Sequence, residues 1–186
     1  APPAETGQPE GRSVLYILLI PEFAREDRAV IDAVRDLWEP ERAALVPPHI
    51  TLMFAVPEGE IDENTVFGAR SDIAGPITLS VERVIAESDR VAGGATIALP
   101  LVQGAEQVRR LHEEAYRGPW RRHLRADIPY VPHLSVGRAA DLAGAEVASR
   151  KIAEALPLPI RATVGRLALV RLVAGKLDTL AQKDLS

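Results

Sequence analysis

Short apolar runs alternate along this chain with segments whose apolar residues recur at helical spacing. Aliphatic and β-branched runs bounded by glycine or proline predict strands, whereas apolar residues three and four positions apart predict helices. The predicted strands are Arg12–Ile20, His49–Val56, Ile77–Ile85, Thr96–Leu99, His133–Arg138, Ile160–Leu172 and Lys176–Ala181. The predicted helices are Phe23–Trp38 (with Val30, Val34 and Leu37 on its apolar face), Asp62–Ala74, Leu101–Tyr116 and Ala140–Leu156.

The order of these elements indicates two similar halves. In each half a helix and a proline-bearing loop lead into a strand that opens with a Pro-His pair. Strands and helices in this order predict an α+β fold of two lobes, each an antiparallel sheet with helices on its outer face. Residues 12–186 would form this single bilobal domain, preceded by a flexible tail over Ala1–Gly11. A loop with Asp89, Gly93 and Gly94 predicts a hairpin.

Composition narrows the classes of protein that fit. The 186 residues are 47% hydrophobic and 26% charged, which is typical of a globular chain. The chain has no cysteine, so disulfides, zinc–thiolate sites and cysteine nucleophiles are excluded. The longest apolar run, Val14–Ile20, stops at Pro21 and lacks the features of a signal peptide or a membrane span. We therefore expect a cytoplasmic protein, monomeric by default, with no membrane association.

The formal net charge of −4 argues against a protein that coats long nucleic acids through general electrostatics. The net charge does not exclude a pocket that binds one phosphate, because such a pocket needs only local positive potential. One arginine-rich stretch contains Arg109, Arg110, Arg117, Arg121, Arg122 and Arg125. This stretch is either a solvated helix face with a basic tail or a rim that steers anions toward a site.

The chemistry-bearing pattern is a repeated tetrapeptide. His49-Ile50-Thr51-Leu52 and His133-Leu134-Ser135-Val136 both follow a proline, and both place a hydroxyl two residues after a histidine. Alternate side chains of a strand share a face, so histidine and hydroxyl lie together about 7 Å apart at their Cα atoms, while the aliphatic residues face a core. A single copy of this motif would more often be a structural histidine, hydrogen-bonded at the edge of a sheet. The presence of two copies favours a functional site.

Two imidazoles and two hydroxyls suit acid–base chemistry at phosphorus. Histidine's ordinary pKa lies near neutrality, so one ring can accept a proton from the attacking group while the other donates one to the leaving oxygen. The hydroxyls can donate hydrogen bonds to the non-bridging phosphate oxygens. This chemistry requires no metal or other cofactor, and two histidines without nearby carboxylates make a poor metal site.

At these two motifs the sequence resembles the 2H phosphoesterase superfamily, in particular its 2′-5′ RNA ligase-like and cyclic phosphodiesterase branch. The signature there is one His-x-(Thr/Ser)-x tetrapeptide in each lobe of a pseudo-symmetric fold, facing each other across a central cleft. The resemblance implies His49 and His133 as the catalytic pair and Thr51 and Ser135 as phosphate-binding residues. It also implies Arg138 as a phosphate contact, although Gly137 could introduce a bulge that re-aims this side chain.

Aromatic side chains near the motifs are candidates for stacking on a nucleobase. We expect Tyr130, three residues before His133, to be the stacking residue, followed by Trp120; core packing is the alternative for both. The remaining aromatic candidates are Tyr16 and Phe54. The two other histidines, His112 and His123, fit no pattern and are expected at the surface.

The resemblance implies a metal-independent phosphodiesterase that opens 2′,3′-cyclic or related 2′-linked phosphates on a nucleotide or RNA end and leaves a 2′-phosphate. Two alternatives stay open at this stage. The same site could perform 2′-5′ RNA ligation, or the chain could be a non-catalytic module that binds a nucleotide or RNA end. The assignment of base and acid is also open, because the two motifs are nearly identical and the pair titrates as a unit.

Overall fold

The computed structural model describes residues 13–59 and 75–185. The predicted tail Ala1–Gly11 and the predicted helix Asp62–Ala74 lie outside the described residues. The strands are β1 (Val14–Leu19), β2 (Glu22–Phe23), β3 (Ile50–Pro57), β4 (Ile77–Val81), β5 (Ile85–Ser88), β6 (Ala95–Pro100), β7 (His133–Ala139), β8 (Ile160–Val164), β9 (Arg166–Val173) and β10 (Lys176–Asp184). The helices are α1 (Arg25–Trp38), α2 (Pro40–Leu45), α4 (Ala105–Ala115), α5 (Leu142–Ala155) and the 3-10 helix η1 (Gly118–His123).

The strands form antiparallel sheets, as the α+β prediction requires. One four-stranded sheet has the order β10-β9-β1-β3, and a three-stranded sheet has the order β5-β6-β7. A second three-stranded sheet, β2-β8-β4, links the other two, because β8 leads into β9 and β4 leads into β5. Among the strands of residues 13–59 and 75–185, each of the two predicted motif strands, β3 and β7, is therefore an edge strand of its own sheet.

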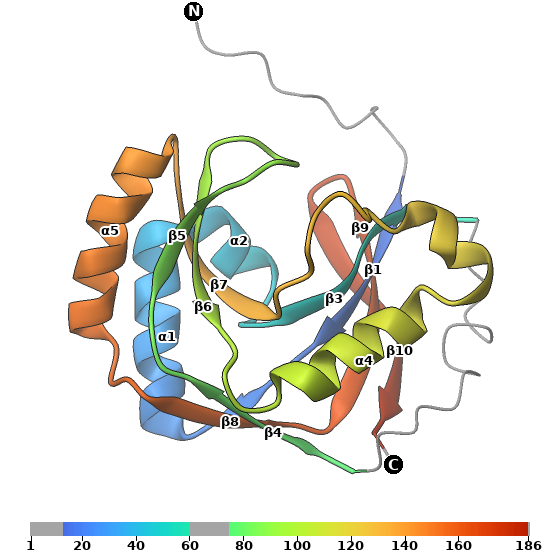
Figure 1. The fold of residues 1–186 in the computed structure, drawn as a ribbon, viewed down its shortest axis with the longest axis horizontal. Helices are drawn as coiled ribbons and strands as arrows, with labels where there is room; N and C mark the ends of the chain where they lie inside the picture. Colours follow the sequence, from blue (N-terminus) through green and yellow to red (C-terminus); the bar gives the residue numbers. More distant parts are fainter. Residues whose placement is uncertain (1–12, 60–74, 186) are drawn as a thin grey trace, which may run out of the picture.

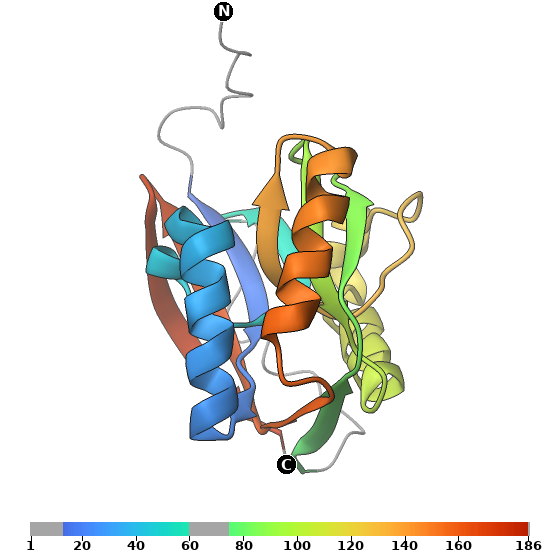
Figure 2. The same cartoon turned by 90° about the vertical axis from the view of Figure 1, so that its left-hand side faces the viewer.

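The helices cover opposite sides of this arrangement. Helices α1 and α5 lie side by side on one side, and α4 lies on the other (Figures 1 and 2). Helix α1 packs on β7, whereas α4 packs on β3, so each motif strand is supported by a helix. Within the described residues no helix combines the length and apolar character needed to cross a membrane. One hydrophobic core runs through all three sheets and includes Leu19, Ile50, Leu79, Ile97, Leu134 and Ile160.

Local signals explain where several elements begin and end. The side chain of Asp141 caps α5 by accepting a hydrogen bond from the Gly144 amide at 2.8 Å. Pro40 ends α1 and opens α2, which fits proline's preference for the first turn of a helix. The predicted hairpin forms between β5 and β6, and Asp89 accepts hydrogen bonds from two amides in its turn.

The sequence predictions were wrong in several boundaries. Ile77–Ile85 is not one strand but β4 and the start of β5, and Ile160–Leu172 divides into β8 and β9. The predicted helix Phe23–Trp38 begins only at Arg25, because Glu22–Phe23 pairs with β8. The short helices α2 and η1 were not predicted. These divisions depend on which sheet each strand joins. The sequence of a continuous apolar run does not indicate where the run passes from one sheet to another.

The buried face of α1 also differs from the prediction. Ile31 and Val34 are buried, but Leu37 is 71% exposed and Arg35 is 1% exposed. The helix buries a charged side chain instead of the nearby leucine. This exchange is energetically acceptable only because Arg35 has a buried carboxylate partner, described below.

Candidate active site

His49 stands immediately before β3, at the end of the Pro47-Pro48 segment that leaves α2. Its Nδ1 lies 2.9 Å from the carbonyl oxygen of Pro47. A carbonyl can only accept, so Nδ1 carries the proton and donates this hydrogen bond. The Nε2 atom is then left with its lone pair when the ring is neutral, and it is the atom available for proton transfer.

His133 opens β7 with the same local arrangement. Its Nδ1 lies 2.7 Å from the carbonyl oxygen of Val131, again two residues before the histidine. The repeat seen in the sequence is therefore also a repeat in structure. In both motifs the backbone fixes the ring through Nδ1 and leaves Nε2 for chemistry.

The hydroxyl residues share the environment of their histidines. His49, Thr51, His133 and Ser135 are all partly buried, between the fully buried core and the exposed surface. The intervening residues belong to the core, as predicted, with Ile50 at 0%, Leu52 at 1%, Leu134 at 2% and Val136 at 0% exposure. Alternation along each strand thus separates a chemical face from a packing face.

The fold brings the two motifs together. Strands β3 and β7 contact each other although they belong to different sheets and are not hydrogen-bonded. The positive charges that lower the pKa of His49 include that of His133. No cluster of three or more potential metal-ligating side chains occurs in residues 13–59 and 75–185.

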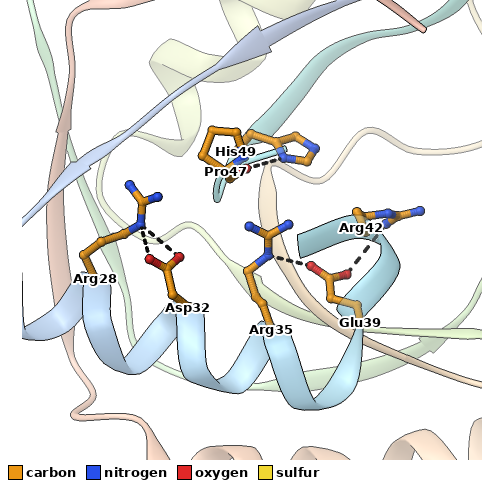
Figure 3. A network of polar contacts seen from close by, with 7 residues as sticks. All are labelled: Arg28, Asp32, Arg35, Glu39, Arg42, Pro47 and His49. Atoms are coloured by element: carbon orange, nitrogen blue, oxygen red, sulfur yellow. Dashed lines mark hydrogen bonds and ion pairs between the residues drawn. The ribbon is translucent and has the colours of Figure 1, made fainter. Parts of the chain in front are cut away.

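A buried ion pair lies behind His49 (Figure 3). The Nε atom of Arg35 donates to Glu39 Oε1 at 2.7 Å, and both side chains are almost fully buried. Arg42 lies 4.0 Å from the second Glu39 oxygen, and its side chain is partly exposed. The guanidinium of Arg35 points from α1 toward Pro47 and His49, and its buried Nη2 atom has no hydrogen-bond partner among the described residues.

The environment of His49 disfavours its protonated form. Burial is the main cause that lowers its pKa from 6.5 to about 4, and the positive charges of Arg35, Arg42 and His133 act in the same direction. The hydrogen bond to Pro47 opposes these effects without overcoming them. His49 is therefore neutral at pH 7 and has the protonation state that a general base requires.

The side chain of Arg138 is hydrogen-bonded to the turn between β5 and β6. Its two terminal nitrogens donate to Asp89 at 2.8 Å and to the Gly93 carbonyl at 2.7 Å, in the turn between β5 and β6. The predicted bulge is confirmed, because the register of β7 against β6 shifts between Ser135 and Gly137. The contact of Arg138 with phosphate stays a prediction, and the contacts seen tie this residue to the hairpin.

Tyr130 lies in the loop before the second motif and contacts the strand of the first motif. Its hydroxyl donates to the carbonyl oxygen of Thr51 at 2.9 Å. Its ring stacks on His112 with a centroid distance of 3.6 Å and an interplanar angle of 5°. One face of the ring is therefore already covered, and its role in base stacking stays a prediction.

The expectation that His112 lies at the surface was wrong. This histidine is 7% exposed, and its Nδ1 donates to the carbonyl oxygen of Leu52 at 2.7 Å. Burial lowers its pKa. Its position four residues after Val108, on the apolar face of α4, is the sequence signal that identifies it as buried.

The other candidates divide between core and surface. Trp120 is 4% exposed and belongs to the core, the alternative considered for it. Phe54 is 48% exposed just beyond the first motif, where an irregularity in the pairing of β3 with β1 interrupts alternation. In the arginine-rich stretch, Arg109 pairs with Glu106 and Arg125 pairs with Asp127.

The fold of this chain resembles several solved structures. The chain resembles apo E. coli LigT with a TM-score of 0.58 and 18% identity, covering 95% of this chain and 99% of LigT. It resembles Kluyveromyces marxianus Usb1 with a TM-score of 0.53 and 12% identity, covering 92% and 98% of the two chains. It resembles TT0787 of Thermus thermophilus with a TM-score of 0.54 and 19% identity, covering 92% and 97%.

At these identities the structural likeness shows the shared fold. A search of curated proteins finds no significant match. A profile described as the 2′-5′ RNA ligase superfamily matches residues 21–176, which include both histidine motifs. The chain therefore belongs to the 2′-5′ RNA ligase superfamily, the 2H phosphoesterase family that its paired motifs resemble.

Proposed function

We propose that this protein is a metal-independent phosphodiesterase that opens 2′,3′-cyclic phosphates on nucleotides or RNA ends, with His49 as general base and His133 as general acid. The observation that carries the proposal is the matched pair of rings. Each ring is held through Nδ1 by the carbonyl two residues earlier, and each leaves Nε2 for proton transfer.

In the proposed reaction the neutral Nε2 of His49 accepts a proton from water as the water oxygen bonds to phosphorus. The bond between phosphorus and the ribose O3′ breaks, and protonated His133 donates its Nε2 proton to that oxygen. The product carries a 2′-phosphate, and the two histidines exchange protonation states during turnover. Thr51 and Ser135 donate hydrogen bonds to the non-bridging oxygens, where charge must be held in the transition state.

The environment of His49 supports its assignment as the base. Burial and the nearby charges of Arg35 and Arg42 keep this ring neutral at pH 7, and a general base must be neutral when substrate binds. Structures of LigT with 3′-AMP and with NADP+, and of Usb1 with uridine monophosphate, are of nucleotide-bound proteins with this fold. They support a nucleotide as the ligand of this chain.

The test is turnover of a panel of 2′,3′-cyclic nucleotides in EDTA, with product regiochemistry recorded from about pH 4 to pH 9. His49→Ala and His133→Ala should each lower kcat by about 10²- to 10⁴-fold, because each removes one acid–base group. Thr51→Val and Ser135→Ala should lower kcat with smaller effects on KM. His123→Ala, which changes a histidine outside both motifs, is the matched control and should keep wild-type kinetics.

The same panel separates the competing functions. A binding module would bind cyclic nucleotides without turnover, and its two histidine variants would change affinity alone. A ligase would join RNA ends carrying a 2′,3′-cyclic phosphate and a 5′-hydroxyl, with loss of the same two histidines abolishing joining. Turnover to a 3′-phosphate would contradict the proposed direction of ring opening.

A further inference from the structure

The first motif lies on an edge strand of its sheet, where backbone groups lack a neighbouring strand among the described residues. Among the described strands, β3 is paired only with β1, and its pairing there is irregular at Thr51 and Met53. Backbone polar groups on such an edge need other partners. On this edge the partners are side chains from two other parts of the chain.

Three ring side chains supply these hydrogen bonds. Tyr130 donates to the Thr51 carbonyl, His112 donates to the Leu52 carbonyl, and the Tyr116 hydroxyl accepts from the Phe54 amide at 3.0 Å. His112 and Tyr116 belong to the region of α4, which packs on β3. Tyr130 differs from both, because it lies in the loop that leads directly into the second motif.

The Tyr130 contact therefore connects the two halves of the site. The donor is three residues before His133, and the acceptor belongs to Thr51, two residues after His49. Between Tyr130 and His133 the backbone is further constrained, because the Val131 carbonyl holds the His133 ring and the Pro132 carbonyl accepts from the Leu101 amide at 3.0 Å. A displacement of Tyr130 would thus be transmitted over a short, constrained segment to the acid histidine.

We propose that the Tyr130 hydroxyl is a positioning group, which sets the separation of the two catalytic histidines by fastening the second-motif loop to the first-motif strand. This inference rests on the proposed function and deepens it. It assigns to Tyr130 a role through its hydroxyl, whereas a base-stacking role would act through its ring.

The surroundings of Tyr130 support a role for the hydroxyl. The ring is stacked on buried His112, which fixes the direction in which the hydroxyl points. Burial also raises the pKa of the Tyr130 hydroxyl above its ordinary value of 10.0, so it keeps its proton and remains a donor across the working pH range. A misplacement of about 1 Å between reacting groups can lower a rate about 100-fold.

The test compares two tyrosine-to-phenylalanine variants. Tyr130→Phe keeps the ring on His112 and removes the link to Thr51, so kcat should fall between about tenfold and 100-fold with KM within about twofold. Tyr116→Phe removes a similarly buried hydroxyl that bonds β3 beyond the motif, and it should keep kcat within about twofold of wild type. Thermal unfolding of both variants reports any general loss of structure.

Two results would overturn the inference: wild-type kcat in Tyr130→Phe, or equal losses of kcat in both variants. If Tyr130→Phe does not fold, Val131→Gly and Val131→Ala replace it, because Val131 is 44% exposed and lies between Tyr130 and His133. The glycine variant loosens the connecting backbone and should lower kcat relative to the alanine variant. Equal kcat in these two variants would also contradict the inference.

A measurement without substrate keeps this inference separate from the proposed function. The imidazole NMR titrations of wild type and Tyr130→Phe report the mutual position of the two histidines, because the charge of His133 contributes to the low pKa of His49. Loosening should move the pKa of His49 up toward 6.5. If wild type turns over no cyclic nucleotide but this change occurs, positioning stands and the proposed reaction fails; unchanged titration would overturn positioning itself.

Discussion

Replacing His49 by Asn should remove a pH dependence from the stability of the fold. In wild type the neutral ring is favoured in the folded state, because burial and nearby positive charge lower its pKa from 6.5 to about 4. In the unfolded chain the ring titrates near its ordinary value. An asparagine amide can still donate to the Pro47 carbonyl, so the variant keeps that hydrogen bond while losing the titrating group.

The magnitude follows from the difference between the two pKa values. At about 1.4 kcal/mol for each pH unit, the interval from 6.5 to about 4 corresponds to roughly 3 kcal/mol. The sign is destabilising on acidification, since the unfolded chain binds a proton in this interval and the folded chain does not. The free energy of unfolding should be unaffected by His49 above pH 6.5, fall between pH 6.5 and about pH 4, and fall no further below that.

Urea unfolding of wild type and His49→Asn at a series of pH values measures this effect. The difference between the two free energies of unfolding cancels the contributions of carboxyl groups that titrate in both proteins. We expect the variant to gain roughly 3 kcal/mol relative to wild type between about pH 7 and about pH 4. A difference that stays constant across this interval would refute a low pKa for His49, and with it the main support for its assignment as the base.

Arg35→Gln should move the acidic limb of the pH–rate profile toward higher pH, because one of the positive charges that lower the pKa of His49 is removed; an unchanged midpoint would show that Arg35 does not contribute to this low pKa. Gly137→Ala should lower the free energy of unfolding by about 1 to 3 kcal/mol, because the added Cβ would lie 2.9 Å from Trp38 Cβ. Urea titrations measure this change, and unchanged stability would show that α1 can move away from β7. Arg138→Ala should lower the free energy of unfolding by about 1 kcal/mol, because the contacts with Asp89 and Gly93 are lost, and unchanged stability would show that these contacts do not support the hairpin. A rise in KM of about tenfold in the same variant would support the predicted phosphate contact.

The paired motifs could be predicted from sequence because their information is local. A proline, a histidine and a hydroxyl residue two positions later define the strand face, and β-strand alternation gives the packing face without knowledge of any neighbour. The hairpin between β5 and β6 is local in the same sense, since Asp89 and two glycines supply its turn. These features were therefore predicted close to their observed positions.

The remaining features depend on partners far away in sequence. A run such as Ile160–Leu172 is apolar throughout much of its length, and its division into two strands is decided by which sheet each part joins. Leu37 and Arg35 are both close to the predicted apolar face of α1, and Arg35 is buried together with its ion-pair partner Glu39, four residues later. Hydropathy alone favours the leucine, so the charged choice could not be predicted from it.

The edge positions of β3 and β7 explain why the geometry of the proposed site depends on contacts between its two halves. Among the described strands, β3 and β7 each have a single hydrogen-bonded neighbour, so part of the backbone of each needs partners other than a strand. Without such partners the first motif would be free to shift, and side chains from α4 and the second-motif loop hold this edge of β3. Because Tyr130 spans 79 positions to reach Thr51, the precision of the proposed site resides in contacts between its halves, while the identity of its proposed catalytic groups resides in each motif alone.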